Sequence, residues 1–196
     1  SYAAQGWLVF NGLNPYETPV SVLPGAFADQ VAWVWRYTPA PYGPLSLQIS
    51  HLMVIVGGLN PYYATLLMRI PALIGVVLIV YFLPRLAARL GADVQLTAWF
   101  STINPLLLID LVGGMHNDAL MIGLIILALY LTHRRPERFW LGAIVVGVAA
   151  AIKQPALLAA YPVALIGLPW QWNTSHVLNK IARAAVSSVI AVATFV

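Results

Sequence analysis

A succession of apolar runs separated by short polar connections constrains the fold of this chain more than any other feature. Several runs approach the roughly 20 residues that an α-helix needs to cross a bilayer. Only 8% of the residues are charged, against about 25% in a typical soluble domain. The sequence therefore predicts an all-α, polytopic membrane protein. The runs cover residues 45–59, 62–83, 94–112, 119–132, 139–152, 156–168 and 181–196.

The first 44 residues are predicted to form a loop rather than a span, because proline and glycine interrupt them at short intervals. Aromatic side chains such as Trp7, Tyr16 and Trp33 suit a loop that lies at a membrane interface. The run 45–59 would be about 22 Å long as a helix. It also contains polar residues, so we expect it to lie in the interface rather than to cross.

Asn60 and Pro61 are expected to begin the first span, as its N-cap and first-turn proline. The sequence thus predicts an external loop with an interfacial helix over residues 1–61. Transmembrane helices are predicted over residues 62–196.

The distribution of charge predicts which side each connection faces. Seven of the ten basic residues fall in three alternate connections, which the positive-inside rule places in the cytosol. Four of the six acidic residues fall in the other connections, provided that 45–59 does not cross. The basic residues flank apolar segments and form no stripe, so no nucleic-acid partner is expected. The basic group is Arg85, Arg89, Arg134, Arg135, Arg138, Lys180 and Arg183, and the acidic group is Glu17, Asp29, Asp110 and Asp118.

The two ends of the chain suggest a fragment of a longer membrane protein. Ser1 follows no methionine, and nothing before Trp7 resembles a signal peptide. The final apolar run, 184–196, has thirteen residues and is predicted to be too short to span. Any site is therefore expected to be partial. Because there is no cysteine, disulfides, thiolate chemistry and cysteine metal sites are excluded.

The segment 111–118, Leu-Val-Gly-Gly-Met-His-Asn-Asp, joins two apolar runs and is the strongest candidate for a site. Asp110 closes the first run and Asp118 opens the second, which places two carboxyls at one membrane edge. Ionisable groups there are costly and indicate function by default. In one alternative, Asn117 and Asp118 only cap the next helix, and His116 is a hydrogen-bonded interfacial histidine. In another, Asp110, His116 and Asp118 hold a divalent metal, although no ligand spacing requires it.

Two cations in apolar surroundings allow two interpretations each. Lys153, followed by Gln154 and Pro155, could extend to water or hold a lipid phosphate beside a broken helix. Arg69 lies two turns inside the run 62–83 and needs a carboxylate partner, such as Asp110, or an anionic ligand.

The same predicted face also contains aromatic and histidine side chains. Tyr42 lies in a proline-rich turn, where an aromatic ring could stack on a sugar or anchor the loop at the interface. His51 belongs to the expected interfacial helix.

Four sequence blocks resemble the polyprenol-phosphate-mannose-dependent α-1,6-mannosyltransferases of actinobacterial lipoglycan assembly. They are Tyr-Ala-Ala-Gln-Gly at 2–6, Gly-Leu-Asn-Pro-Tyr at 12–16, Pro-Tyr-Gly-Pro-Leu at 41–45 and Gly-Gly-Met-His-Asn-Asp-Ala-Leu-Met at 113–121. The resemblance continues in order to about residue 162. It implies a GT-C-type transmembrane helix bundle with a large first external loop, here residues 1–44.

The resemblance also implies a reaction and its partners. A multi-pass plasma-membrane enzyme would move mannose from polyprenyl-phosphate-mannose to an α-1,6-mannan acceptor of lipomannan or lipoarabinomannan on the periplasmic or extracellular side. Membrane lipids would surround it, and no cofactor is expected beyond the lipid-linked co-substrate. A phosphate leaving group needs no general acid, so one carboxylate base can suffice for an inverting transfer.

Residue roles follow from matching this chain to the family. The catalytic aspartate of GT-C enzymes usually follows the first span, a position that would lie before Ser1. Asp118 would therefore position acceptor or donor, and serve as base only as a second choice, with His116 beside it. The expected substrate-binding residues are Asn117, Asp110, Tyr42, His51, Lys153, Gln154 and Arg69.

Two other classes of function remain open at this point. A transporter or flippase of a lipid-linked sugar would place polar residues deep in several spans and show related halves. Here the polar residues gather at one face and no repeat is evident, which favours the enzyme. A catalytically silent membrane subunit is the third possibility. The sequence also leaves open the sugar, since arabinose or glucose donors are similar, and the need for a metal.

Overall fold

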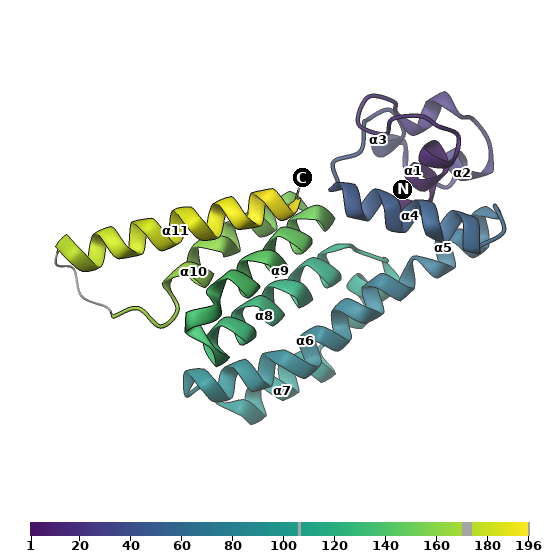
Figure 1. Cartoon of the computed structure of the whole chain (residues 1–196). Coiled ribbons are helices and arrows are strands. Elements are labelled where there is room, and N and C mark those ends of the chain that lie inside the picture. Colours follow the sequence, from purple (N-terminus) through teal and green to yellow (C-terminus); the bar gives the residue numbers. More distant parts are fainter. Residues whose placement is uncertain (106, 170–173, 196) are drawn as a thin grey trace. The chain divides into compact units, whose positions relative to one another are not determined.

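A computed structural model describes residues 1–105, 107–169 and 174–195, and every regular element in these ranges is a helix (Figure 1). The chain divides into two compact units, Ser1–Ile70 and Pro71–Val196. The predicted division at residue 61 was drawn where the membrane was expected to begin, and it stays a prediction.

The first unit packs short helices around a small apolar core. The core joins Ala4 and Leu8 of the first helix to Val54 and Ala64 of later ones. A Cβ at Gly6 would overlap the backbone of Ser50, so the glycine allows two helices to approach closely. The elements are α1 (Tyr2–Phe10), the 3-10 helix η1 (Val20–Val22), α2 (Ala26–Asp29), α3 (Trp33–Arg36), α4 (Pro44–Val56) and α5 (Pro61–Leu67).

Helix α4 corresponds to the predicted interfacial run. It is an apolar helix of 13 residues with a proline in its first turn, which is shorter than the roughly 20 residues of a span. Its place at a membrane interface stays a prediction. The predicted cap of the next helix is confirmed, since Oδ1 of Asn60 accepts hydrogen bonds from the backbone N–H of Tyr62 (2.9 Å) and Tyr63 (3.4 Å).

Within the described ranges, two helical segments are long and apolar enough to cross a membrane, judged by length and composition. The first, Pro61–Leu90, joins α5 to α6 (Arg69–Leu90) and extends past the predicted end at residue 83. The second is α11 (Thr174–Phe195). The prediction that the C-terminal run is too short to span is therefore wrong. Polar residues such as Ser175 and Lys180 continue this helix toward its N-terminus, where hydropathy gave no signal.

The predicted run 94–112 is not one straight helix. It forms α7 (Val94–Ile103) and the π-helix η2 (Leu107–Gly113), which meet at 49° and together would count as a third span. The break follows from Pro105, which lacks a backbone N–H and disfavours helical geometry at the residue before it. Asn104 accordingly takes an extended conformation, with φ −64° and ψ 109°.

The rest of the second unit is a layer of helices packed side by side (Figure 1). It contains α8 (Asp118–Arg134), η3 (Pro136–Arg138), α9 (Phe139–Ile152), η4 (Gln154–Ala159), α10 (Ala160–Leu165) and α11. Small buried residues, including Ala128, Ala160 and Ala191, let these helices pack closely. Helices α8 and α9 match the predicted runs 119–132 and 139–152, but have 17 and 14 residues. A larger number of spans therefore stays a prediction.

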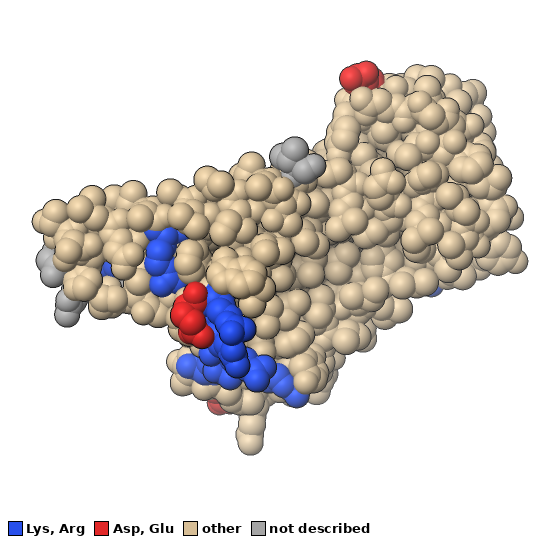
Figure 2. Space-filling model, viewed as in Figure 1, with Lys and Arg blue, Asp and Glu red and all other residues tan. Residues whose placement is uncertain are grey.

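Basic side chains gather at one end of the second unit (Figure 2). The guanidinium of Arg89, on α6, lies 5.3 Å from the ring of Tyr130 near the end of α8. Arg183 of α11 donates to the carbonyl oxygens of Pro136 (3.1 Å) and Ile166 (3.4 Å). The three basic connections thus share one end of this unit, as the charge pattern predicted. The side of the membrane that this end faces stays a prediction.

Candidate functional site

An ion pair between Lys153 and Asp118 is the central feature of the candidate site. The Lys153 ammonium donates to both carboxylate oxygens of Asp118, at 2.7 and 3.0 Å. The two side chains are about one third exposed, at 30% and 32%, so solvent still reaches the pair. The other ion pair in the described ranges, Arg36 with Asp29, is longer, at 3.7 Å. Lys153 and Asp118 therefore neutralise each other in this state.

The end of α9 directs Lys153 toward α8. The helix ends at Ile152, and Lys153 takes an extended conformation, with φ −153° and ψ 121°. Its carbonyl then accepts from Ala156 N–H (3.1 Å) as η4 begins. Pro155 cannot continue the α-helical hydrogen bonding, so a proline in the sequence accounts for the end of the helix. Because the backbone leaves the helix at this residue, the lysine stem can cross to the neighbouring helix.

The start of α8 is held in place from two sides. Ala149, Ala150 and Ala156 form a buried cluster against which Met121 and Leu124 of α8 pack. On the other side, α6 lies so close to α8 that a Cβ at Gly75 would overlap the backbone of Ala119. Asp118 is the first residue of the helix, where the positive end of the helix dipole favours a carboxylate. Packing, dipole and Lys153 thus fix this carboxylate together.

The turn before α8 brings the predicted residues His116 and Asn117 to the same end. The His116 ring lies over Gly114, where a Cβ would come within 2.9 Å of its Nε2. Met115 has a left-handed backbone with φ 55°, a strained conformation for a side chain of this size. No hydrogen bond joins the exposed His116 ring to Asp118 in the described part of the chain. The sharp turn therefore sets the histidine beside the ion pair without bonding it there.

The capping interpretation is not supported for Asn117. This buried residue occupies the N-cap position of α8, but its side chain makes no capping hydrogen bond. Asp118 lies one position further on, and its carboxylate bonds Lys153. Capping alone therefore does not account for the two residues.

Asp110 precedes Asp118 in the sequence, and Gln154 directly follows Lys153. Asp110 is exposed on the π-helix η2, a type of helix that is frequent at functional sites. Gln154 is partly exposed and begins η4, directly after Lys153. Within the described ranges, no three His, Asp or Glu side chains gather closely enough to hold a metal ion.

Three predicted site residues belong to the first unit. Tyr42 is half-buried, and its ring lies 4.8 Å from that of Tyr2. His51 of α4 lies 6.2 Å from the Phe10 ring. Arg69 is exposed at the start of α6. Their participation in a site with Asp118, and the pairing of Arg69 with Asp110, stay predictions because they would join the two units.

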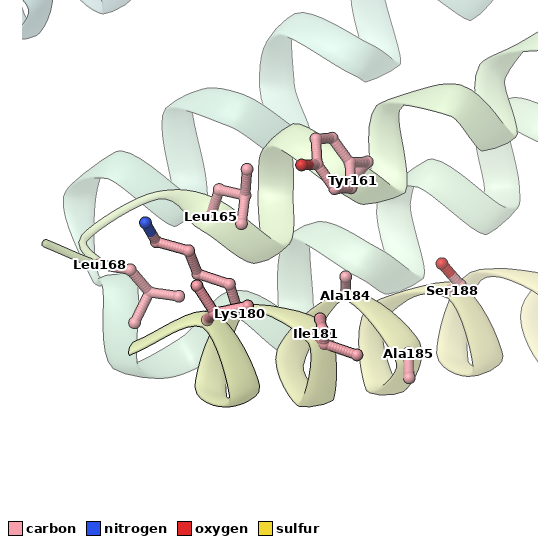
Figure 3. Close-up of a pocket in the computed structure, with 9 residues that line it drawn as sticks. Tyr161, Leu165, Leu168, Lys180, Ile181, Ala184, Ala185 and Ser188 are labelled. Atoms are coloured by element: carbon pink, nitrogen blue, oxygen red, sulfur yellow. The ribbon is translucent and has the colours of Figure 1, made fainter. Parts of the chain in front are cut away.

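An apolar groove of about 440 Å³ runs between α10 and α11 (Figure 3). Leu165, Ile181 and Ala184 line it, and Lys180 lies at one end. None of its lining residues is a predicted site residue. The groove is therefore distinct from the Lys153–Asp118 site.

Sequence reasoning placed Asp118 and Lys153 at the same end of the bundle but missed that they pair with each other. The signal in the sequence was that two residues of opposite charge lie at the adjoining ends of consecutive helices, Asp118 where α8 begins and Lys153 where α9 ends. It also missed Gly75, whose role is visible only once α6 and α8 pack. Chemically, the pair offers an ammonium suited to an anion and a carboxylate suited to a hydroxyl.

These features define an all-helical protein with candidate membrane spans and a charged pair at one end of its second unit. The chain belongs to the family described as "Alpha-(1->6)-mannopyranosyltransferase, N-terminal domain", which it matches over residues 1–169. The predicted family resemblance is thereby confirmed.

Curated relatives agree with this assignment. The chain is 37% identical to alpha-(1->6)-mannopyranosyltransferase A of Mycobacterium tuberculosis, over 100% of this chain and 38% of that protein. It is 34% identical to the protein of the same name from Corynebacterium glutamicum, over 86% of this chain and 34% of that one. A further M. tuberculosis alpha-(1->6)-mannopyranosyltransferase is 45% identical, over 64% of this chain and 22% of that protein. The chain thus spans less than two fifths of the length of these relatives. No solved structure matches it.

Proposed function

We propose that this protein is a polyprenyl-phosphate-sugar-dependent α-1,6-mannosyltransferase. It moves mannose from polyprenyl-phosphate-mannose to an α-1,6-mannan acceptor of the lipomannan or lipoarabinomannan core, with inversion at the anomeric carbon. The names of the relatives support the mannosyl transfer. The observation that carries the proposal is the Lys153–Asp118 ion pair, which puts an anion-binding group and a carboxylate at one place.

The ion pair suggests how a lipid-linked donor would be received. A phosphate oxygen competes with the Asp118 carboxylate for the Lys153 ammonium, because both are anions that accept strong charge-assisted hydrogen bonds. When the phosphate takes the lysine, Asp118 loses its partner and can accept a hydrogen bond from a sugar hydroxyl. Lys153 then offsets the charge that develops on the phosphate as the glycosidic bond breaks. Donor binding would thus prepare the carboxylate for its role.

The neighbouring residues complete this arrangement. Asp118 orients acceptor or donor, and abstracts the acceptor proton only if no other base does so. His116, exposed beside it, is positioned to contact the same substrate. Asn117, Asp110 and Gln154 supply further polar groups at this end of the unit.

We further propose that the protein is a multi-pass GT-C-type bundle in the plasma membrane, with its site on the non-cytosolic face. Helix α8 supports this orientation, because it begins at Asp118 and ends at Arg134. Its 17 residues separate the ion pair from the arginine-rich end by about 25 Å at 1.5 Å per residue. A charged pair at a helix end favours an edge site over the midplane path of a transporter.

The test uses membranes that contain the full-length protein, labelled polyprenyl-phosphate-mannose and a short α-1,6-mannoside. We expect α-1,6-linked product that depends on the protein. Asp118→Asn should abolish transfer per unit of folded protein, and Lys153→Gln should raise the KM for the donor. Lys153→Arg should recover part of the donor affinity.

The matched control is Glu137→Gln, which removes an exposed carboxylate at the arginine-rich end and should leave transfer unchanged. If Asp118→Asn with His116→Ala retained activity, the proposed site would be wrong. If the folded wild-type protein transferred no mannose, the donor assignment would be wrong.

A further inference from the structure

One five-residue sequence motif occurs twice in the first unit. Gly-Leu-Asn-Pro-Tyr occurs at 12–16 and at 58–62, and each copy comes after a helix, α1 or α4. Both glycines are left-handed, with φ 73° at Gly12 and 64° at Gly58. The next residue donates five positions back, from Leu13 to Leu8 and from Leu59 to Val54, at 3.0 Å in both. The motif is therefore a helix-ending turn used twice.

The two copies differ in the structure on the C-terminal side of the turn. Asn60 caps α5 by accepting from Tyr62 and Tyr63. Asn14 accepts from Tyr16 N–H at 3.1 Å, yet the chain then makes a single turn rather than an α-helix. The first copy thus does not start a helix, and its Tyr16 remains 44% exposed. Helix-start chemistry explains the second copy but leaves the first without a role.

The first copy lines a hollow of about 390 Å³ together with the start of α4. This volume falls in the range of roughly 300 to 1,000 Å³ that is usual for small-molecule sites. Leu13 and Leu47 provide apolar walls, and Asn14, Tyr16 and Gln48 provide polar groups. The Pro15 carbonyl accepts from Ala40 N–H at 2.8 Å, which ties this turn to the segment before α4.

The lining selects for a neutral ligand. All nine described residues around the hollow are uncharged, so an anion would find no compensating charge there. An aromatic ring with apolar walls suits the C–H face of a pyranose, and the amides suit its hydroxyls. The exposed Gln48 side chain makes no hydrogen bond with the described residues. A tyrosine phenol is protonated at neutral pH, so Tyr16 can donate a hydrogen bond, and partial burial raises its pKa further.

A second hollow, beside the other copy of the motif, shares the uncharged lining and has an exposed tyrosine, Tyr63, but carries a single side-chain amide among its described lining residues. It is lined by Val56, Gly58, Tyr63 and Leu66, with Asn60 as its amide. The Asn60 oxygen is already occupied by the two backbone donors of α5. Of these two hollows, the first therefore combines an exposed aromatic ring with a second amide.

We propose that the hollow formed by Gly12–Tyr16 and Pro44–Gln48 binds a neutral mannosyl unit of the acceptor glycan. The identification of the sugar as mannose rests on the proposed function, whereas the neutral pyranose class rests on the lining itself. The hollow belongs to the first unit and is distinct from the Lys153–Asp118 pair, which suits the charged donor. Acceptor and donor would thus be bound by chemically different sites.

The test measures binding of α-1,6-linked mannotetraose to the solubilised full-length protein by saturation-transfer NMR. We expect Tyr16→Ala to weaken binding by about tenfold or more, through loss of ring contact, and Gln48→Ala to weaken it less. Tyr16→Phe keeps the ring and should retain most of the binding. It therefore separates the contribution of the ring from that of the hydroxyl, and an unfolding temperature of Tyr16→Ala equal to that of the wild type separates loss of contact from loss of folding.

The matched control is Tyr37→Ala, an exposed tyrosine of the same unit that does not line the hollow. Its binding should equal that of the wild type. Unchanged binding in both Tyr16→Ala and Gln48→Ala would overturn the inference, as would absence of binding to the wild type.

Comparison with the transfer assay separates this inference from the proposed function. If the protein transfers mannose normally but mannotetraose binding does not change in Tyr16→Ala, the binding site in the hollow is rejected and the proposed function stands. Binding that depends on Tyr16, in a protein that transfers no mannose, would reject the transferase and keep the glycan site.

Discussion

Lys153 and Asp118, the residues at the centre of the proposed site, each satisfy the charge of the other where water is only partly available. Exposed ion pairs contribute about 0 to 1 kcal/mol, whereas breaking a buried pair by removing one partner costs about 3 to 5 kcal/mol. With side chains about one third exposed, this pair lies between these cases. An interaction of this intermediate strength can order the two side chains and still be exchanged, as the proposed displacement of the carboxylate by a donor phosphate requires.

A double-mutant cycle on the pair should therefore show coupling. We expect Lys153→Met and Asp118→Asn each to destabilise the protein by about 1 to 2 kcal/mol, and the double variant to lose less than the sum. The reason is that either single change leaves one charge of the pair without its counter-charge. Thermal unfolding of the detergent-solubilised protein measures the effect, and strictly additive shifts would show that the pair contributes no coupling.

At the scale of the elements, glycines determine how closely helices approach. Gly75 of α6 lies where α8 begins, and Gly123 of α8 in turn faces the Gly75 carbonyl. Such small residues are typical of helix contacts inside membranes, where van der Waals packing replaces the hydrophobic effect. The position of Asp118 thus depends on a helix that contributes no group to the ion pair.

Gly75→Ala should displace the start of α8. The added Cβ would overlap the Ala119 backbone, and such overpacking costs about 1 to 3 kcal/mol. We expect a lower unfolding temperature and reduced mannosyl transfer. Gly113→Ala is the matched control for unfolding, because among the described residues its Cβ would meet only the Leu108 carbonyl oxygen at 3.6 Å, an ordinary contact. Equal effects of the two substitutions would contradict the close approach.

The cap of α5 provides a second test at this scale. Asn60→Ala removes the acceptor for two backbone donors and should lower stability by about 1 kcal/mol. Asn60→Asp keeps a capping oxygen and should remain close to the wild type in thermal unfolding. A destabilisation by Asn60→Asp as large as that by Asn60→Ala would show that the cap is not what the asparagine provides.

The same elements show what a sequence can reveal about this fold. Asn60 and Pro61 were predictable because capping depends on neighbours within one turn, and α9 was predictable from its continuous apolar run. The pairing of Lys153 with Asp118 was not, since 35 residues separate them and only packing of α8 on α9 brings them together. The full length of α11 was missed because its first turns are polar. The break at Asn104 was missed because an average of hydropathy along the run does not register Pro105.

At the scale of the whole molecule, charge placement relates the helices to the membrane. Within the second unit, arginines occupy the end where α6 and α8 finish, and the Lys153–Asp118 pair occupies the end where α8 begins. Basic residues beside spans are retained on the cytosolic side. The arrangement therefore predicts an orientation as well as a fold, and orientation decides whether a lipid-linked sugar outside the cell can reach the site.

Cysteine labelling tests this orientation directly, because the chain has no cysteine of its own. Glu137→Cys lies at the arginine-rich end and Glu17→Cys in the predicted external loop, and both positions are exposed. In intact cells a membrane-impermeant maleimide should label Glu17→Cys and leave Glu137→Cys unlabelled until the membrane is opened. Each substitution removes one negative charge, so the two variants are matched in charge. The reverse labelling pattern would place Asp118 and Lys153 on the cytosolic side, where an extracellular mannan acceptor could not reach them.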